Sequence, residues 1–233
     1  AQIPTRNLTF IENRNGYVAT YSITLNVYDR LGLLVGAQFF QNAVHLARLN
    51  DLPLEVLRFN FSLSSGEHKI VVYVTDLSSL DSYVFNKLIN VPDYCTPEPQ
   101  MSDLQLALSI KRSGESSSFS KHGWHVFPNV SNIFVEPFNT LFFYVELYNL
   151  SGSPNNSKMS LNSVLTIKDI GGNTLKTTIS PNLKFGPNNA VIGQIPIDEL
   201  GGGHYKLTLG VTDSDYGQSI EKSIHFAVMG PSS

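Results

Sequence analysis

Apolar and polar side chains alternate with a period of two along most of the chain, and this period is typical of β-strands. The clearest case is the stretch 17–28, in which one set of alternate positions is apolar and expected to face a core. The core-facing set is Ala19, Tyr21, Ile23, Leu25 and Val27. Similar patterns predict strands at 7–12, 33–40, 57–63, 66–76, 81–90, 104–110, 141–150, 161–168, 190–197, 203–213 and 220–228. Residues 42–51 fit neither a helical nor a strand period clearly, and we expect them to connect two sheets.

One strand unit occurs twice. Residues 66–76 and 203–213 share Gly, Lys, Val, Thr and Asp at identical internal spacing. Each copy is expected to begin at a turn glycine, to continue as an alternating strand, and to end at an aspartate that accepts backbone hydrogen bonds in the next turn. These turn and strand-end positions are Gly66, Asp76, Gly203 and Asp213. The repetition predicts two copies of one domain.

A second pair of turns recurs in the same order. Asp29 and Gly32 bound one hairpin turn, and Asp169 and Gly172 bound its counterpart at nearly the same interval along the chain. In each turn the aspartate is expected to accept local backbone hydrogen bonds while the glycine supplies a left-handed conformation. Two recurring features in the same order favour duplication over coincidence.

Domain boundaries follow from a proline-rich stretch between the two copies. Three prolines within residues 91–100 favour a stiff, extended backbone. Short strands at regular spacing and the lack of a long helical pattern predict an all-β chain of two tandem immunoglobulin-like or fibronectin-III-like β-sandwiches. The predicted organisation is a first sandwich at 1–91, a linker at 92–100 and a second sandwich at 101–229.

The penultimate strand of the second domain carries a candidate tyrosine corner. Tyr205 lies just inside that strand after a glycine-rich turn, where its phenol is expected to hydrogen-bond back to the turn. His68 takes the same place in the first copy. We therefore expect the corner to be weaker or rebuilt in the first domain.

Composition and charge narrow the classes of function. The chain has 42% hydrophobic and 11% aromatic residues, enough to fill two cores, but only 15% charged residues. The net charge is −3 and no block of basic residues occurs, so the sequence shows no basic surface that would attract nucleic acid or an anionic membrane. No run approaches the roughly 18 apolar residues of a membrane span. Cys95 is the only cysteine, which excludes an intramolecular disulfide.

The two ends of the sequence resemble cut ends. Residues 1–4 are typical of the end of a strand, and residues 229–233 are typical of the start of a linker. We therefore expect the chain to belong to a longer protein, with an incomplete first strand in its first domain.

Few residues suggest chemistry, and each has a structural alternative. His122 and His125 flank Trp124 and could be combined with Glu136 or Glu146 in a metal or acid–base site. In a strand the i, i+3 spacing points the two imidazoles to opposite faces, which favours a structural role.

The sequence also contains candidate ligands for calcium. Asp76, Asp213 and Asp215 supply the hard oxygen ligands that calcium prefers, but without a third nearby carboxylate they make a poor cage. Many serines occur, but none lies in a Gly-x-Ser-x-Gly elbow. We expect no cofactor, no metal and no catalytic residue.

Three segments of the second domain carry a family resemblance: a Ser-Asp strand, a Phe-x-Lys-x-Gly segment ending in Pro-Asn, and a Tyr-x-Glu-x-Tyr-Asn-Leu strand. These segments are 102–107, 119–131 and 143–150. The chain resembles the tandem β-sandwich region of bacterial GWxTD-domain-containing proteins, although the module that names the family is absent. The resemblance implies a periplasmic, outer-envelope or extracellular setting, and it carries over no catalytic residue.

Three hypotheses of function remain. The first is a non-catalytic structural or protein-interaction module of the cell envelope or a secreted protein, with protein partners or self-association through sheet edges or loops. The second is a subunit of a self-assembling surface filament or layer, with an open edge beside residues 8–10. The third is a carbohydrate-binding accessory domain that uses Trp124 or exposed tyrosines.

Overall fold

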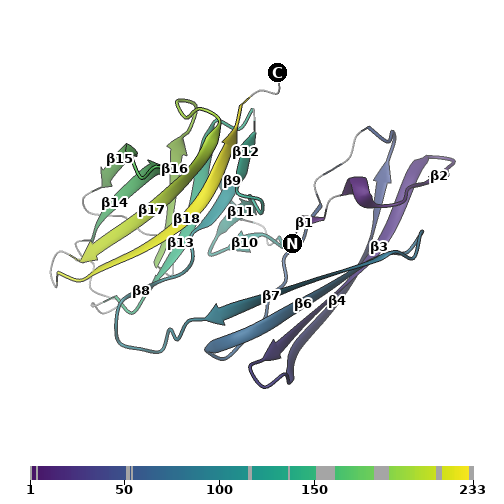
Figure 1. The fold of residues 1–233 in the computed structure, drawn as a ribbon, viewed down its shortest axis with the longest axis horizontal. Coiled ribbons are helices and arrows are strands. Elements are labelled where there is room, and N and C mark those ends of the chain that lie inside the picture. The colour runs from purple at the N-terminus through teal and green to yellow at the C-terminus, as the bar shows by residue number, and fades with distance from the viewer. Residues whose placement is uncertain are drawn as a thin grey trace. The chain divides into compact units, whose positions relative to one another are not determined.

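A computed structural model describes residues 2–3, 5–50, 53, 55–114, 117–135, 137–150, 161–180, 189–213 and 217–230. Strands dominate these residues, and the only helix among them is a short 3₁₀ turn, η1 (Thr5–Asn7). The all-β prediction is therefore confirmed. The chain divides into two compact units, Ala1–Asp93 and Tyr94–Ser233 (Figure 1). No helix in the described part of the chain is long and apolar enough to span a membrane.

The first unit is built on one antiparallel sheet. Its long strands are ordered β4, β3, β6, β7, and a short strand, β2, pairs with the start of β3. The bounds are β2 (Ile11–Asn13), β3 (Gly16–Asp29), β4 (Leu34–Leu46), β6 (Gly66–Asp76) and β7 (Ser82–Val91). The predicted inward set of β3 is confirmed, because all five residues are buried.

A thin second layer covers part of this sheet. It contains η1 and a two-stranded sheet of β1 (Gln2–Ile3) and β5 (Glu55–Val56). Its Ile3 joins a small core with Tyr21, Ile23, Val44 and Leu46. The layer packs against β3, β4 and β6, while the large side chains of β7 remain mostly exposed.

Three details of the first unit differ from the sequence prediction. Residues 42–46 do not connect sheets, because β4 continues through Leu46 and pairs with β3 over its whole length. Residues 57–63 alternate between half-buried and exposed as expected, but they form no regular strand. The alternation of apolar and polar residues indicates which side chains are buried, and it does not show that the backbone pairs with another strand. The expected strand at 7–12 starts as η1, in which Leu8 N donates to Thr5 O, and becomes a strand only at Ile11.

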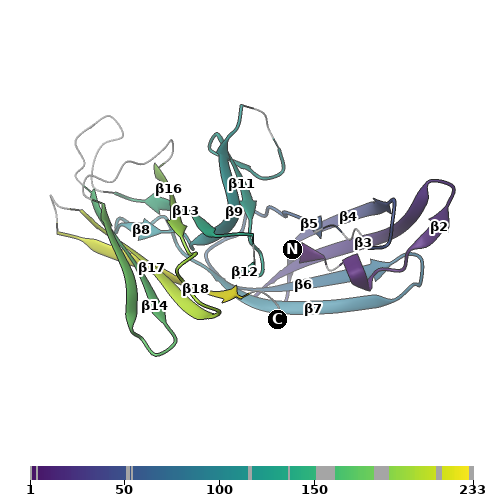
Figure 2. The same cartoon turned by 90° about the horizontal axis from the view of Figure 1, so that it is seen from above.

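The second unit is a complete sandwich. One sheet has the order β10, β11, β9, β13, β16 with β8 also paired to β13, and the other has the order β12, β18, β17, β14, β15. Inward side chains from both sheets form one apolar core, and Figure 2 shows the sheets as two layers. The first sheet contains β8 (Gln100–Met101), β9 (Gln105–Arg112), β10 (Ser120–Lys121), β11 (Trp124–Pro128), β13 (Thr140–Tyr148) and β16 (Ala190–Pro196). The second sheet contains β12 (Ile133–Val135), β14 (Leu161–Asp169), β15 (Thr174–Ser180), β17 (Gly203–Asp213) and β18 (Ser219–Met229).

The sequence repeat corresponds to a repeated sheet. In the first unit the order is β4, β3, β6, β7, and in the second it is β15, β14, β17, β18, with the same connections. Both repeated strand units, β6 and β17, have the predicted bounds. The two units differ in the second layer, which is a full sheet only in the second unit.

The stretch predicted as a linker has contacts within the second unit from Tyr94 onward. The Tyr94 ring lies 4.3 Å from the Tyr148 ring, and the Tyr94 carbonyl accepts a hydrogen bond of 2.9 Å from the Asn149 side chain. Gln100 and Met101 then pair with β13 as β8. Cys95 is exposed.

The tyrosine corner differs between the two units. The phenol of Tyr205 donates to the carbonyl oxygen of Gly201 at 2.7 Å, and the ring is buried. At the corresponding place His68 is also buried, and its Nδ1 lies 3.1 Å from the carbonyl oxygen of Gly66. In its Nδ1-protonated tautomer the ring donates a hydrogen bond to this carbonyl. The side chain in the first unit is therefore also tied to its own turn, but to a residue two positions earlier rather than four.

Replacing Tyr205 with phenylalanine tests this corner. We expect Tyr205→Phe to lower the free energy of unfolding of the second unit by about 1 kcal/mol, because the buried Tyr205 ring no longer donates its hydrogen bond to the Gly201 carbonyl. Urea titration followed by intrinsic fluorescence measures the change. The half-exposed Tyr73→Phe is the control and should leave stability nearly unchanged; equal losses in both variants would contradict the assigned role.

Candidate functional site

The two Asp-x-x-Gly hairpins hold their aspartates in local turns. Asp29 Oδ1 accepts from the backbone N–H of Leu31 and Leu33 at 2.8 and 2.9 Å, and Gly32 has φ +81°. Asp169 accepts from the backbone and side chain of Asn173 at 2.8 and 2.9 Å. Hydrogen bonds from the Asn173 side chain and backbone hold the pKa of Asp169 below its usual value.

In the second hairpin the glycine again takes the left-handed position, since Gly172 has φ +85°. The glycine that opens each repeated strand behaves less uniformly: Gly66 has φ +115°, whereas Gly203 is not in the left-handed region. All of these residues serve the backbone of hairpins or strand starts.

Asp76 closes the first repeated strand from a buried position. One carboxylate oxygen accepts from the backbone N–H of Ser78 and Ser79, and the other accepts from Thr9 at 2.6 Å. Burial raises the pKa of Asp76, but these N–H bonds outweigh burial, so the pKa lies below its usual value. The carboxylate therefore ties the turn after β6 to the segment before β2.

Asp213 occupies the same position at the end of β17. It is buried, its N–H donates to Gln218 O, and its carbonyl accepts from Gly217 N, both at 2.8 Å. Asp76 and Asp213 belong to different units, and Asp215 lies outside the described residues. Within the described part of the chain, no three His, Cys, Asp or Glu side chains group closely enough to hold a metal ion.

The two histidines around Trp124 have separate neighbours. His122 lies in the turn before β11 with φ +46°, and its Nε2 is 3.5 Å from Glu146 Oε1. His125 lies in β11 with its ring edge-on to Phe119. Trp124 is half-buried, and the Arg112 guanidinium lies 4.7 Å from its ring centre. Glu136 is outside the described residues.

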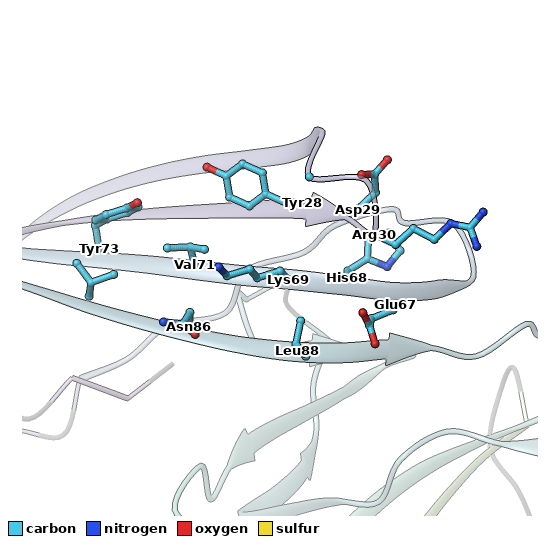
Figure 3. A pocket seen from close by; sticks show the side chains of 12 residues that line it. Tyr28, Asp29, Arg30, Glu67, His68, Lys69, Val71, Tyr73, Asn86 and Leu88 are labelled. Carbon is cyan, nitrogen blue, oxygen red and sulfur yellow. The ribbon is translucent and has the colours of Figure 1, made fainter.

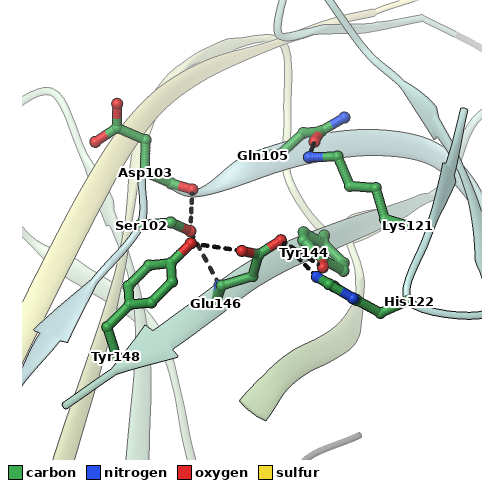
Figure 4. A network of polar contacts seen from close by, with 8 residues as sticks. All are labelled: Ser102, Asp103, Gln105, Lys121, His122, Tyr144, Glu146 and Tyr148. Atoms are coloured by element: carbon green, nitrogen blue, oxygen red, sulfur yellow. Dashed lines mark hydrogen bonds and ion pairs between the residues drawn. The ribbon is translucent and has the colours of Figure 1, made fainter. Parts of the chain in front are cut away.

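The densest polar cluster of the second unit centres on Glu146 (Figure 4). The phenol of Tyr144 donates to Glu146 Oε1 at 2.7 Å, and the phenol of Tyr148 donates to Oε2. The Ser102 hydroxyl accepts from the Glu146 backbone N–H at 2.9 Å and donates to the Asp103 carbonyl. The carboxylate is thus bonded at both oxygens.

Lysine extends the cluster on one side. Lys121 donates to the Gln105 side chain at 2.6 Å, and its ammonium lies 4.8 Å from the Tyr144 ring centre. Sequence reasoning named Glu146 and His122 but missed the two tyrosines. The signal was present, because Tyr144, Glu146 and Tyr148 are spaced at i, i+2 and i+4 and therefore share one face of β13, opposite the sandwich core.

The electrostatics make Glu146 an anionic hydrogen-bond acceptor. Burial raises its pKa, but the hydrogen bonds from Tyr148 and Tyr144 and the charges of His122 and Lys121 outweigh burial and hold the pKa below its usual value. Burial, followed by the bond to Glu146, raises the pKa of Tyr148. A carboxylate in this state accepts hydrogen bonds at neutral pH and does not supply a proton.

Two open depressions lie on the units. A cleft of about 480 Å³ borders the Glu146 cluster and is lined by Asp103, Gln105, Asn129 and Asn132 among others. A wider trough of about 610 Å³ lies on the first unit, where Tyr28, Tyr73, Lys69 and Asn86 point from neighbouring strands (Figure 3). Both are shallow and mixed in polarity.

The last candidate is the edge strand β7. Among the described residues it pairs only with β6, so one edge of its backbone is unpaired. Four large side chains along it are mostly exposed, on both faces of the sheet. They are Tyr83 (58%), Val84 (58%), Phe85 (60%) and Leu88 (63%). Long apolar edges of this kind are uncommon in natural sheets, because they recruit other strands.

The comparisons with known proteins found only distant structural neighbours. No family model and no curated protein matches the sequence. The chain is similar to the dimeric latent PorU of Porphyromonas gingivalis, with 12% identity and a TM-score of 0.35 over 95% of this chain and 20% of that one. It is also similar to the β-glucuronidase of Parabacteroides merdae, with 12% identity and a TM-score of 0.32 over 94% of this chain and 28% of that one. The chain spans less than a third of either neighbour.

A glutamine at position 146 tests the polar cluster. We expect Glu146→Gln to lower the free energy of unfolding of the second unit by about 1–3 kcal/mol at neutral pH, because the buried phenol of Tyr144 and the half-buried phenol of Tyr148 lose a charged acceptor. The depressed pKa of Glu146 means that its contribution is complete above the unfolded-state pKa and disappears as pH falls through the folded-state pKa. The difference between variant and parent should therefore narrow below about pH 4.

Chemical denaturation at a series of pH values measures this difference. Glu221→Gln is the matched control, because Glu221 is an exposed strand residue of the same unit. A gap between Glu146→Gln and parent that stays constant in acid would contradict the assigned electrostatics.

Proposed function

We propose that this chain is a non-catalytic structural and protein-interaction module of a bacterial cell envelope or a secreted protein, and that β7 is its main contact surface. The observation that carries the proposal is the unpaired apolar edge of β7. Backbone groups on such an edge supply hydrogen bonds to an added strand, and the flanking side chains supply specificity.

The side chains that could take part in chemistry are held in structural hydrogen bonds, and this supports a structural role. Glu146 is bonded at both oxygens, and Asp76 is bonded to three backbone N–H groups. The low charge content and the resemblance to the tandem sandwich region of GWxTD-domain-containing proteins favour an exported setting. Self-assembly into a filament or layer remains the main alternative within this class.

Position-specific cross-linking tests the proposal. A photo-reactive phenylalanine analogue at position 88 should give protein adducts in the producing cells, because Leu88 lies on the unpaired edge. The same analogue at position 170 is the control, since Ile170 is 88% exposed but lies in a hairpin turn. Equal adduct yields at both positions, or none at position 88, would refute β7 as the contact surface.

The trough of the first unit favours a second candidate, a carbohydrate-binding accessory domain. Tyr28 and Tyr73 present aromatic surface beside the polar groups of Lys69 and Asn86, a combination suited to sugar rings (Figure 3). Trp124 is less suited, because the Arg112 guanidinium already lies over its ring.

A glycan array decides this alternative. If the trough binds sugar, a glycan retained by the parent chain should lose measurable binding to Tyr73→Ala and keep its binding to Trp124→Ala. Binding that depends on Trp124 instead, or no bound glycan at all, would remove the trough as a sugar site.

A further inference from the structure

The hydrogen-bonding groups on the free edge of β7 can be identified residue by residue. Asp76 N donates to Asp81 O across the hairpin, and the next pair in the ladder is Thr75 with Ser82. Bonded and non-bonded pairs alternate in an antiparallel ladder, so Ser82 belongs to a non-bonded pair and turns its N–H and C=O away from β6. The same holds for every second residue, namely Ser82, Val84, Asn86, Leu88 and Asn90.

The sequence of β7 is nearly symmetric about Asn86. If a second β7 is laid antiparallel with Asn86 opposite its own copy, Val84 faces Leu88 and Ser82 faces Asn90. On the other face Tyr83 meets Ile89 and Phe85 meets Lys87. At the free-edge positions polar residues oppose polar residues and Val84 opposes Leu88, while on the other face each lysine has the aromatic ring of Phe85 opposite it.

The two nearest alternative registers are poorer. Centring the pair on Lys87 places the two lysines directly opposite each other, and like charges in that position are destabilising. Centring it on Phe85 places Val84 opposite Asn86 and Leu88 opposite Ser82, and it shortens the ladder. All three registers keep free-edge groups opposite free-edge groups, but only the register centred on Asn86 matches polarity at every free-edge pair.

The matching strand of the second unit lacks the apolar side chains at the equivalent free-edge positions. The ladder pairs Thr75 with Ser82 and Thr212 with Ser219, so Val84 and Leu88 correspond to Glu221 and His225 of β18. The edge of β18 is also partly closed, because β12 pairs with its last residues. Of these two matching strands, β7 alone has an apolar edge that no described strand pairs with.

From these observations we infer that the partner of β7 is the β7 strand of a second copy of this chain, paired antiparallel about Asn86 to join two first-unit sheets. The contact is isologous and closes as a two-fold dimer. The β6–β7 ladder has no register shift that would twist the edge away. This inference deepens the proposed function, since it rests on β7 as the contact surface and names its occupant.

Charge substitutions on β7 test both the partner and the register. The parent chain should show a monomer–dimer equilibrium in analytical ultracentrifugation with a Kd below about 1 mM. Val84→Lys should weaken the dimer by about tenfold or more, because each copy then opposes a lysine to Leu88. The double variant Val84→Lys/Leu88→Glu should restore the dimer, because each lysine then faces a glutamate.

Val164→Lys is the matched control, since Val164 is also exposed but lies in β14, which is paired on both edges. It should leave the Kd unchanged. Amide hydrogen exchange also reports the register. Exchange of the backbone N–H groups of Val84, Asn86 and Leu88 should slow as the protein concentration rises and the dimer forms. The exchange rates of the Phe85 and Lys87 N–H groups, which face β6, should not change.

The outcomes separate this inference from the proposed function. A monomer at all concentrations, or a double variant as weak as Val84→Lys, overturns pairing with a second copy in this register. If position 88 then still cross-links to a different protein in cells, β7 remains the contact surface and only its partner changes. If neither is found, both proposals fail.

Discussion

The requirement to bury one face of a twisted antiparallel sheet governs both halves of this chain. Strand β3 places Tyr21, Ile23 and Val27 on one face with no exposed surface, so a second layer must lie there. The second unit meets the requirement with an entire opposing sheet. The first unit meets it with β1, η1, β5 and the irregular segment 57–63, which leave Tyr83 and Phe85 on the same face of β7 mostly exposed. The exposure of these two side chains is thus a consequence of how little chain the second layer contains.

Much of the fold could be predicted because strands repeat every two residues and turns use few residue types. The repeated unit, the Asp29 and Asp169 hairpins and the inward set of β3 are visible in the pattern alone. Pairing was less visible. Residues 57–63 alternate in burial but find no ladder, and β4 continues past Phe40, because hydrogen-bond partners depend on distant segments that local pattern does not report.

The candidate sites were harder to predict for the same reason. The Tyr144, Glu146 and Tyr148 spacing indicates a shared face, but the approach of His122 and Lys121 depends on the turn that carries them back toward β13. His68 and Tyr205 illustrate the opposite case. Their equivalence follows from the repeat, and each ring reaches a backbone carbonyl of its own turn, at Gly66 and Gly201. Equivalent positions are thus tied to their turns by different side chains and at different carbonyl groups.

The two copies of the repeated sheet show which side chains this fold requires and which it only tolerates. Strands β7 and β18 occupy the same place in the same sheet order, beside the same strand unit. At two matching positions β18 carries Glu221 and His225, so this architecture accepts polar side chains there. Folding of the sheet therefore does not explain Val84 and Leu88, whose exposed apolar surface is a liability for an isolated unit. The partner strand that we propose for β7 would shield them from solvent.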